Sequence, residues 1–227
     1  MSMVIRSSFV ALFFLVLSAK CVVASIQVFP TEYQSNWTPG GNSWYVDNGY
    51  SGSTVGGLFG GVGELIDGVK GTPITSGYSQ WAPYSLIDVG GGSAEITYIY
   101  HFDQKYVWES IVQYQYIYHK AAVYQPTSFE VSFSIDGGST YHSSVIRSMS
   151  DAENSLIRGT AEYSLLGAAT GYHADAIRIV LNQPSRWSAT DEVEFVASAV
   201  VPESSSVALI ISACSIICAA CFRHLNA

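Results

Sequence analysis

Asp67 provides the strongest case in the sequence for a chemical site. It lies in residues 64–71, ELIDGVKG, where a carboxylate is followed by glycine and further turn-forming residues. Such a loop offers one carboxylate and several free backbone carbonyls, and calcium takes roughly six to eight oxygen ligands. Asp-Gly is equally typical of an ordinary turn, because both residues tolerate turn conformations. The loop alone therefore fits either a calcium loop or a plain turn.

Catalytic chemistry has little support in the sequence. The five histidines, at 101, 119, 142, 173 and 224, form no HExxH motif or other metal-binding spacing. No Gly-x-Ser-x-Gly nucleophile elbow is present. The four cysteines, at 21, 214, 218 and 221, leave residues 25–201 without a cysteine nucleophile, a thiolate zinc site or a disulfide. These patterns favour a non-catalytic protein, with a hydrolase that uses loop carboxylates as the weakest alternative.

The charge balance of the body is acidic. Residues 25–201 contain seven Lys and Arg against seventeen Asp and Glu, a formal charge of −10. Nucleic acids and anionic membranes are bound through clustered cations, so this balance argues against nucleic acid as a partner. It is compatible with divalent cations and with neutral sugars.

Alternation of apolar and polar residues predicts that this body is all-β. Residues 94–103, 128–136, 175–182 and 191–198 alternate as strands with one buried face do, and 109–119 is a further strand rich in tyrosine. Asp136-Gly137-Gly138 predicts a hairpin. Only 151–156 and 161–166 favour a helical turn or two. Many short strands with Gly-rich turns indicate one antiparallel β-sandwich over residues 26–198.

The order of these motifs resembles the discoidin-like, galactose-binding-like β-sandwich, a jelly-roll fold, across most of 45–198. The matching residues are Leu65-Ile66-Asp67-Gly68, Trp81, Ser134-Ile135-Asp136-Gly137 and Glu192-Val193-Glu194-Phe195. The resemblance implies a structural calcium ion between the Asp-Gly loop and the last strand. Its ligands would be the side chains of Asp67 and Glu192 with oxygens of Val69 or Thr72. The long connection from residue 71 to 81 departs from the family pattern and leaves the remaining ligands open.

The same resemblance implies carbohydrate binding. Sugar sites pair an aromatic platform with a few polar groups, because a sugar ring has apolar faces and many hydroxyls. Trp37, Trp44 and Tyr45 lie in loop-like sequence and are the candidate ligand-binding residues. The alternative for any one of them is packing within the fold, since strands absorb aromatic residues readily.

Residues 1–24 are predicted to be a cleaved export signal. A short basic start, an apolar stretch at 9–19, and the small residues Val22 and Ala24 before a cut at Ser25 fit that pattern. An N-terminal membrane anchor fits less well, because a span needs about 20 apolar residues and Lys20 interrupts this one. Lys20 also argues against lipidation at Cys21.

Residues 201–227 resemble a PEP-CTERM sorting signal. Val201, Pro202 and Glu203 match its motif, residues 207–222 are an uncharged apolar run, and Arg223 begins the short basic end. As a helix the run would be about 24 Å long, slightly short for a bilayer core of about 30 Å. The resemblance implies a bacterial envelope protein, attached through a C-terminal membrane helix and handled by an exosortase. Ser204 replaces the second proline of the family motif, so processing stays open.

The sequence therefore predicts an exported, envelope-sorted, non-catalytic module. Its expected role is carbohydrate binding or adhesion at the cell surface or in an extracellular matrix, with polysaccharide as the partner. A structural display protein without a small ligand is the alternative.

Overall fold

The computed structural model describes residues 25–36, 50–52, 58–70, 85–88, 93–166, 171–184 and 187–199. The strands are β1 (Ser25–Val28), β2 (Glu32–Ser35), β3 (Leu58–Gly61), β4 (Ser85–Asp88), β5 (Ala94–Tyr118), β6 (Ser128–Ser134), β7 (His142–Ser148), β8 (Arg158–Leu166), β9 (Tyr172–Gln183) and β10 (Trp187–Ala199). The helices are η1 (Glu64–Ile66), η3 (His119–Ala121) and α2 (Asp151–Asn154). The paired strands run antiparallel, which confirms the all-β prediction.

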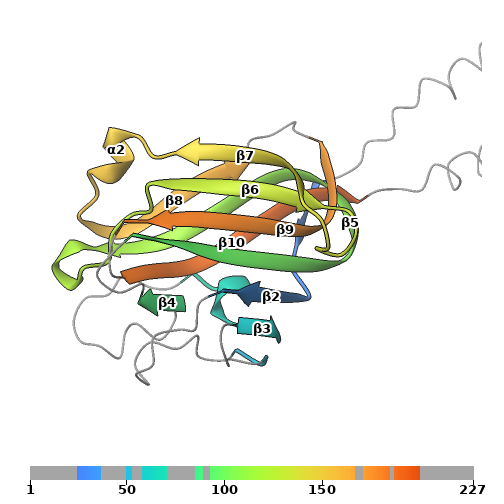
Figure 1. Ribbon diagram of the computed structural model, residues 1–227, viewed down its shortest axis with the longest axis horizontal. Helices are drawn as coiled ribbons and strands as arrows, with labels where there is room; N and C mark the ends of the chain where they lie inside the picture. Colours follow the sequence, from blue (N-terminus) through green and yellow to red (C-terminus); the bar gives the residue numbers. More distant parts are fainter. Residues whose placement is uncertain are drawn as a thin grey trace, which may run out of the picture.

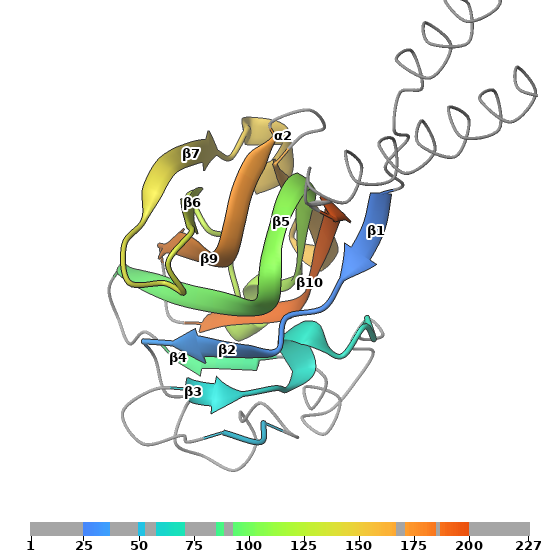
Figure 2. The same ribbon diagram turned by 90° about the vertical axis from the view of Figure 1, so that its right-hand side faces the viewer.

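The long strand β5 belongs to two layers. Its first half pairs with β2 and β9, and its second half pairs with β8 and β10. The register with β9 shifts between His101 and Tyr106, where residues 103–105 are exposed. A bulge absorbs these polar residues without ending the strand. The two strands predicted at 94–103 and 109–119 are therefore one strand, and the sheet folds over on itself around it (Figure 2).

The hydrophobic core lies between these two layers. Phe129 of β6 packs against Tyr163 of β8 with ring centroids 5.2 Å apart. Trp108 of β5 is fully buried, lies 4.4 Å from Phe102 between ring centroids, and donates its indole N–H to the carbonyl of Ala174 at 3.1 Å. An aromatic ring of this size removes a large apolar area from water, so Trp108 is a principal contact between neighbouring strands.

The helical turn predicted at 161–166 is wrong, because this segment is part of strand β8. Tyr163 and Leu165 are buried while Glu162 and Ser164 are exposed, which is the period of two that a strand requires. Pairing with the second half of β5 supplies the backbone hydrogen bonds. The other predicted turn, at 151–156, contains α2.

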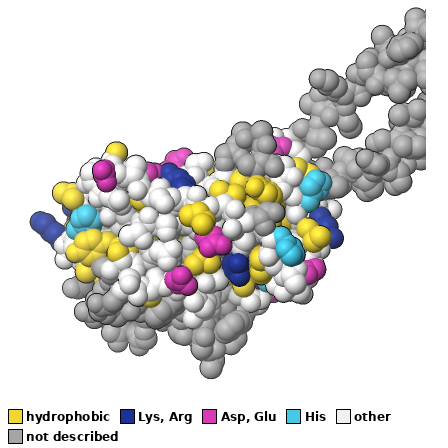
Figure 3. Space-filling view, turned by 45° about the horizontal axis from the view of Figure 1, so that its top comes forward, with side chains coloured by type: hydrophobic (Ala, Val, Ile, Leu, Met, Phe, Trp, Pro, Cys, Tyr) yellow, Lys and Arg dark blue, Asp and Glu magenta, His cyan; other side chains and the backbone are white. Residues whose placement is uncertain are grey.

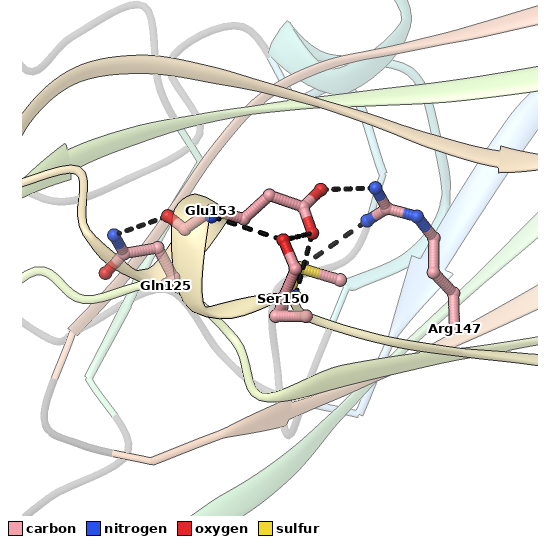
Figure 4. A network of polar contacts seen from close by, with 5 residues as sticks. Gln125, Arg147, Ser150 and Glu153 are labelled. Carbon is pink, nitrogen blue, oxygen red and sulfur yellow. Dashed lines mark hydrogen bonds and ion pairs between the residues drawn. The ribbon is translucent and has the colours of Figure 1, made fainter.

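The α2 turn is anchored by a capping box. Ser150 accepts the N–H of Glu153, and the Glu153 carboxylate accepts the N–H and hydroxyl of Ser150. Arg147 pairs with the same carboxylate, and Gln125 donates to the Glu153 carbonyl at 3.2 Å (Figure 4). The backbone and hydroxyl of Ser150, followed by Arg147, lower the pKa of Glu153 to about 2.

The predicted hairpin after β6 is confirmed, and two glycines make its turn. Gly137 and Gly138 have φ values of 69° and 87°, in the region that L side chains avoid. Asp136 accepts hydrogen bonds from Ser134 and Thr140, and these donors hold the pKa of its carboxyl well below the usual range.

Gly138→Ala is expected to cost roughly 2–3 kcal/mol of stability, against about 1 kcal/mol for Gly137→Ala. A Cβ at Gly138 would lie 3.0 Å from the Tyr141 hydroxyl and 3.1 Å from His101, whereas a Cβ at Gly137 meets nothing within 4 Å. Urea unfolding of both variants checks the difference. Equal losses would mean that only the backbone conformation matters.

The two chain ends of the sandwich meet at one corner. Strand β1 runs beside the end of β10 (Figure 2). Ser25 pairs with Ser198 there, and Glu109 accepts hydrogen bonds from both hydroxyls. We call Ser25, Glu109 and Ser198 the terminal corner. Hydrogen bonds from Ser198 and then Ser25 lower the pKa of Glu109.

The predicted export signal at 1–24 and the sorting signal at 201–227 both lie outside the described residues. Within the part of the chain that the structure describes, no helix is long and apolar enough to cross a bilayer.

Candidate functional site

The loop after η1 lies against strand β10. Gly68 adopts a φ of 77°, and its N–H donates to Glu192 Oε2 at 3.2 Å across a separation of 124 residues. Asp67 Oδ1 accepts the N–H of Val69 at 2.7 Å, which closes the turn. The ring of Phe29 would lie 3.3 Å from a Cβ at Gly68, so glycine also allows the loop to approach this ring.

Glu192 is buried because β10 is irregular at this point. The register between β10 and β5 shifts between Thr190 and Val193, and the residues within the shift, Asp191 and Glu192, are 0% and 1% exposed. Alternation alone would have put Glu192 on the face opposite Val193, yet both are buried. A bulge changes which side chains point inward, and here it directs a carboxyl group into the protein.

The surroundings of Glu192 favour its neutral form. Burial, followed by the nearby charge of Asp67, raises the pKa of Glu192 to about 8, against a hydrogen bond from Gly68 that lowers it. A carboxyl group without water around it holds a proton more tightly, and a second carboxylate close by adds to that effect. Ionising Glu192 beside Asp67 is therefore costly, and a nearby cation would offset that cost.

A lysine fixes the other end of the same loop. Lys70 Nζ lies 2.8 Å from Glu194 Oε1 and 3.9 Å above the ring centroid of Tyr114. The Tyr114 hydroxyl donates to Glu194 Oε2 at 3.0 Å, so the three side chains form one network. The hydrogen bond to Glu194 raises the pKa of Lys70 beyond its usual range. This network of Lys70, Tyr114 and Glu194 holds the loop that carries Asp67 against β10.

The structure brings together two of the residues predicted to bind calcium. Asp67 and Glu192 are adjacent, and Val69, which is 60% exposed, follows in the same loop. Thr72 lies outside the described residues. Within those residues, no group of three or more His, Cys, Asp or Glu side chains could hold a metal ion. A cation at this place would need backbone carbonyls in addition to the two carboxylates.

The other predicted site residues cannot be placed. The candidate sugar-binding residues Trp37, Trp44 and Tyr45 lie outside the described residues. The sorting residues Val201, Pro202, Glu203 and Arg223 do so as well. All of these assignments stay predictions.

A second cluster lies at the end of the sandwich opposite the terminal corner, where β5 ends and β10 begins (Figure 1). Bridges from Val123 to Tyr118 and to Trp187 join these two strands through the η3 turn. The His119 ring stacks on Tyr124 with centroids 4.7 Å apart. The Arg158 guanidinium lies 5.1 Å from the Tyr118 ring centroid. We call Tyr118, His119, Tyr124, Arg158 and Trp187 the aromatic tip.

The aromatic tip rests partly on buried side chains of the fold, and its own side chains are partly or largely exposed to solvent. Tyr116, Val123 and Ala189 form a small buried cluster, against which Tyr118 and Trp187 are partly buried. His119 Nε2 lies 3.0 Å from Gln125 Oε1, which orients the ring. The tip therefore combines fixed aromatic faces with hydrogen-bonding groups. Sequence reasoning missed it because Arg158 and Trp187 come from distant segments, although the tyrosine-rich run before the η3 turn was a visible signal.

The molecular surface elsewhere is mixed in character. On the described part of the face in Figure 3, hydrophobic side chains form small clusters separated by polar and charged atoms. This distribution differs from the large contiguous apolar patch that marks an extensive protein-binding surface.

Comparison with known proteins gives only distant structural likenesses. No family model and no curated protein matches the sequence. The C-terminal domain of a chitobiase from Bacteroides fragilis superposes with a TM-score of 0.44 and 12% identity, over 78% of this chain and 95% of that one. The lectin domain of lectinolysin, complexed with Lewis B antigen, superposes with a TM-score of 0.42 and 11% identity, over 74% of this chain and 94% of that one. A truncated AlyQ with CBM32 and alginate lyase domains superposes with a TM-score of 0.40 and 15% identity, over 79% of this chain and 35% of that one. The chain thus spans about a third of that last protein.

Proposed function

We propose that this protein is a non-catalytic carbohydrate-binding module with a discoidin-like β-sandwich. The observation that supports this best is the aromatic tip, where half-buried rings and polar side chains are held together at the end of the sandwich. The family resemblance of the sequence motifs points to the same function.

The aromatic tip has the chemistry that a sugar ring requires. The exposed face of an aromatic side chain covers the C–H face of a sugar, and charged or amide groups beside it bind hydroxyls. Tyr124 and Trp187 would supply the rings, and His119 and Arg158 the hydrogen bonds. Because Trp187 rests on a packed cluster and Tyr124 stacks on His119, little conformational entropy is lost when a sugar binds.

Trp187→Ala and Tyr124→Ala are expected to weaken glycan binding by the full-length chain by about tenfold or more each, because each removes a stacking surface. A glycan array identifies a ligand, and titration calorimetry measures its Kd.

The control is Tyr172→Ala, which alters a half-buried tyrosine at the start of β9 that stacks on Phe133 and is not part of the tip. It should bind as the unaltered protein does. Binding that survives both tip variants would refute the tip as the site. Silence across neutral and acidic glycans would instead favour the display role.

We further propose a structural calcium ion between Asp67 and Glu192. The paired carboxylates and the raised pKa of Glu192 support it, because a divalent cation would replace the proton on that group. The Val69 carbonyl and Thr72 would be further ligands. Bound calcium would hold the 64–70 loop on β10.

Calcium is expected to raise the melting temperature relative to chelator. The linkage is worth about 2.7 kcal/mol when free calcium is at a hundredfold its Kd. Asp67→Asn should abolish this response, whereas Asp151→Asn, an exposed acid in α2, should keep it. An unchanged transition with calcium in the unaltered protein would sink the proposal.

Export and envelope sorting complete the proposal. The terminal corner is at the opposite end of β10 from the aromatic tip, so attachment through residues 201–227 would turn the tip away from the membrane. An exosortase would act near Pro202. Mass spectrometry of the protein from its own cells should find a cut before Ser25 and a second near Pro202. An intact N-terminus would contradict the export signal.

A further inference from the structure

A row across four strands on one face of the sandwich contains three polar side chains and one isoleucine. Cα pairing places Gln34 of β2, Ile99 of β5, Arg178 of β9 and Ser132 of β6 in a single line. Residues opposite one another across a sheet project from the same side. The hairpin after β6 brings Tyr141 over this row, against Gly138 and His101. We call Gln34, His101, Ser132, Tyr141 and Arg178 the Arg178 face.

Arg178 is held in place without using most of its donors. Its Nε donates to Ser132 Oγ at 3.0 Å, and its Cζ lies 4.6 Å from the ring centroid of Tyr141. The side chain is half-buried. Among the described residues it has no ion pair, whereas Lys70 and Arg147 each have a carboxylate partner. Its terminal Nη groups make no hydrogen bond within the described part of the chain and are not among the buried polar atoms, so they remain open to an acceptor from solution.

The groups around Arg178 are already arranged as partners. Gln34 Nε2 lies 3.1 Å from His101 Nε2, which fixes the amide beside the row. The two aspartates nearest Tyr141 are satisfied elsewhere: Asp136 by Ser134 and Thr140, and Asp175 by the N–H of Gly137. Glu130 is the closest acid along β6, one position beyond Ser132 on the same face, and it lies outside ion-pair range.

We propose that the Arg178 face binds the carboxylate of an acidic sugar. A planar guanidinium presents two parallel N–H donors that match the two oxygens of a carboxylate, and charge-assisted bonds of this kind are about twice as strong as neutral ones. The amide of Gln34 and the ring of His101 would bind hydroxyls of the same residue. The edge of Tyr141 would border the ring. A neutral sugar leaves the guanidinium without a counter-charge and binds less well. This site is separate from the aromatic tip and does not depend on it.

Trigalacturonate, with galactotriose as the neutral comparison, is the probe for the full-length chain. Titration calorimetry or ¹⁵N chemical shifts should detect the first ligand and not the second. Arg178→Gln should weaken trigalacturonate binding by about tenfold or more, since it removes a charge-assisted pair. Arg178→Lys should recover only part of the affinity, because lysine keeps the charge but lacks the paired donors.

Lys105→Gln is the matched control, since it removes the same charge from an exposed position at the β5 bulge. It should bind trigalacturonate unchanged. Melting curves establish that each variant is folded. Equal binding of galactotriose, or equal losses in Arg178→Gln and Lys105→Gln, would overturn the inference. So would a loss of trigalacturonate binding in Trp187→Ala with none in Arg178→Gln, which would assign the acidic sugar to the tip.

Discussion

Glu192→Gln is expected to stabilise the calcium-free protein by roughly 3 kcal/mol at pH 7, with almost no effect at pH 4. In the folded protein the pKa of Glu192 is about 8, against an ordinary value of 4.5. Between these two values the unfolded chain has lost the proton and the folded chain has kept it. The folded state then binds more protons, so stability is complete below pH 4.5 and declines as the pH rises towards 8. Glutamine is neutral throughout and removes that decline.

Urea unfolding in chelator at several pH values measures this effect. The free energy of unfolding of the unaltered protein should fall between pH 5 and 8. The free energy of unfolding of Glu192→Gln should not show this fall. Glu130→Gln, on the solvent-facing side of β6, is the control and should preserve the fall. Parallel profiles for Glu192→Gln and the unaltered protein would show that Glu192 ionises normally in the folded state. Calcium should remove the decline in the unaltered protein alone.

Trp108→Ala is expected to cost about 3–5 kcal/mol, the usual range for deleting a large buried aromatic ring. Trp108 is fully buried where β5 passes between the layers, and its ring contacts Phe102, Tyr106 and Phe195. Alanine would leave a cavity among these rings and remove the indole donor from the Ala174 carbonyl. Denaturant unfolding gives the loss directly.

Trp108→Phe separates the two contributions. It keeps most of the packing and removes the hydrogen bond, so a loss of about 1–3 kcal/mol is expected. If Trp108→Phe were as damaging as Trp108→Ala, the hydrogen bond rather than the ring would dominate. A loss below 1 kcal/mol for alanine would mean that the neighbouring rings close over the gap.

The strands were predictable because their side chains alternate, and the errors arose where alternation is interrupted. Residues 103–105 are polar enough to suggest a turn, but a register shift lets β5 continue through them. Segment 161–166 contains good helix formers, yet pairing with β5 overrides that local preference. Local pattern indicates which residues can form a strand, whereas the partner strand decides how long it is.

The candidate site was predictable only in part. Motif resemblance was sufficient to pair Asp67 with Glu192 across more than a hundred residues, because each motif stands next to a recognisable turn or strand. The burial of Glu192 was not predictable, because it follows from a β-bulge that the alternation of apolar and polar residues does not reveal. Arg178 and Tyr141 meet only because β9 and a hairpin are folded together, and no spacing along the chain records that contact.

The terminal corner has a mechanical consequence. Because β1 starts beside the end of β10, a pull on residues 25 and 199 acts on neighbouring ends of two antiparallel strands. Their hydrogen bonds run across the strands, so this load would open them in succession, as a zipper opens, rather than all at once. β1 is held to β10 by four paired residues, whereas the same end of β10 is also held by its long pairing with β5, so β1 would detach first. A tether at both ends could thus yield under tension and leave the aromatic tip and the Arg178 face intact.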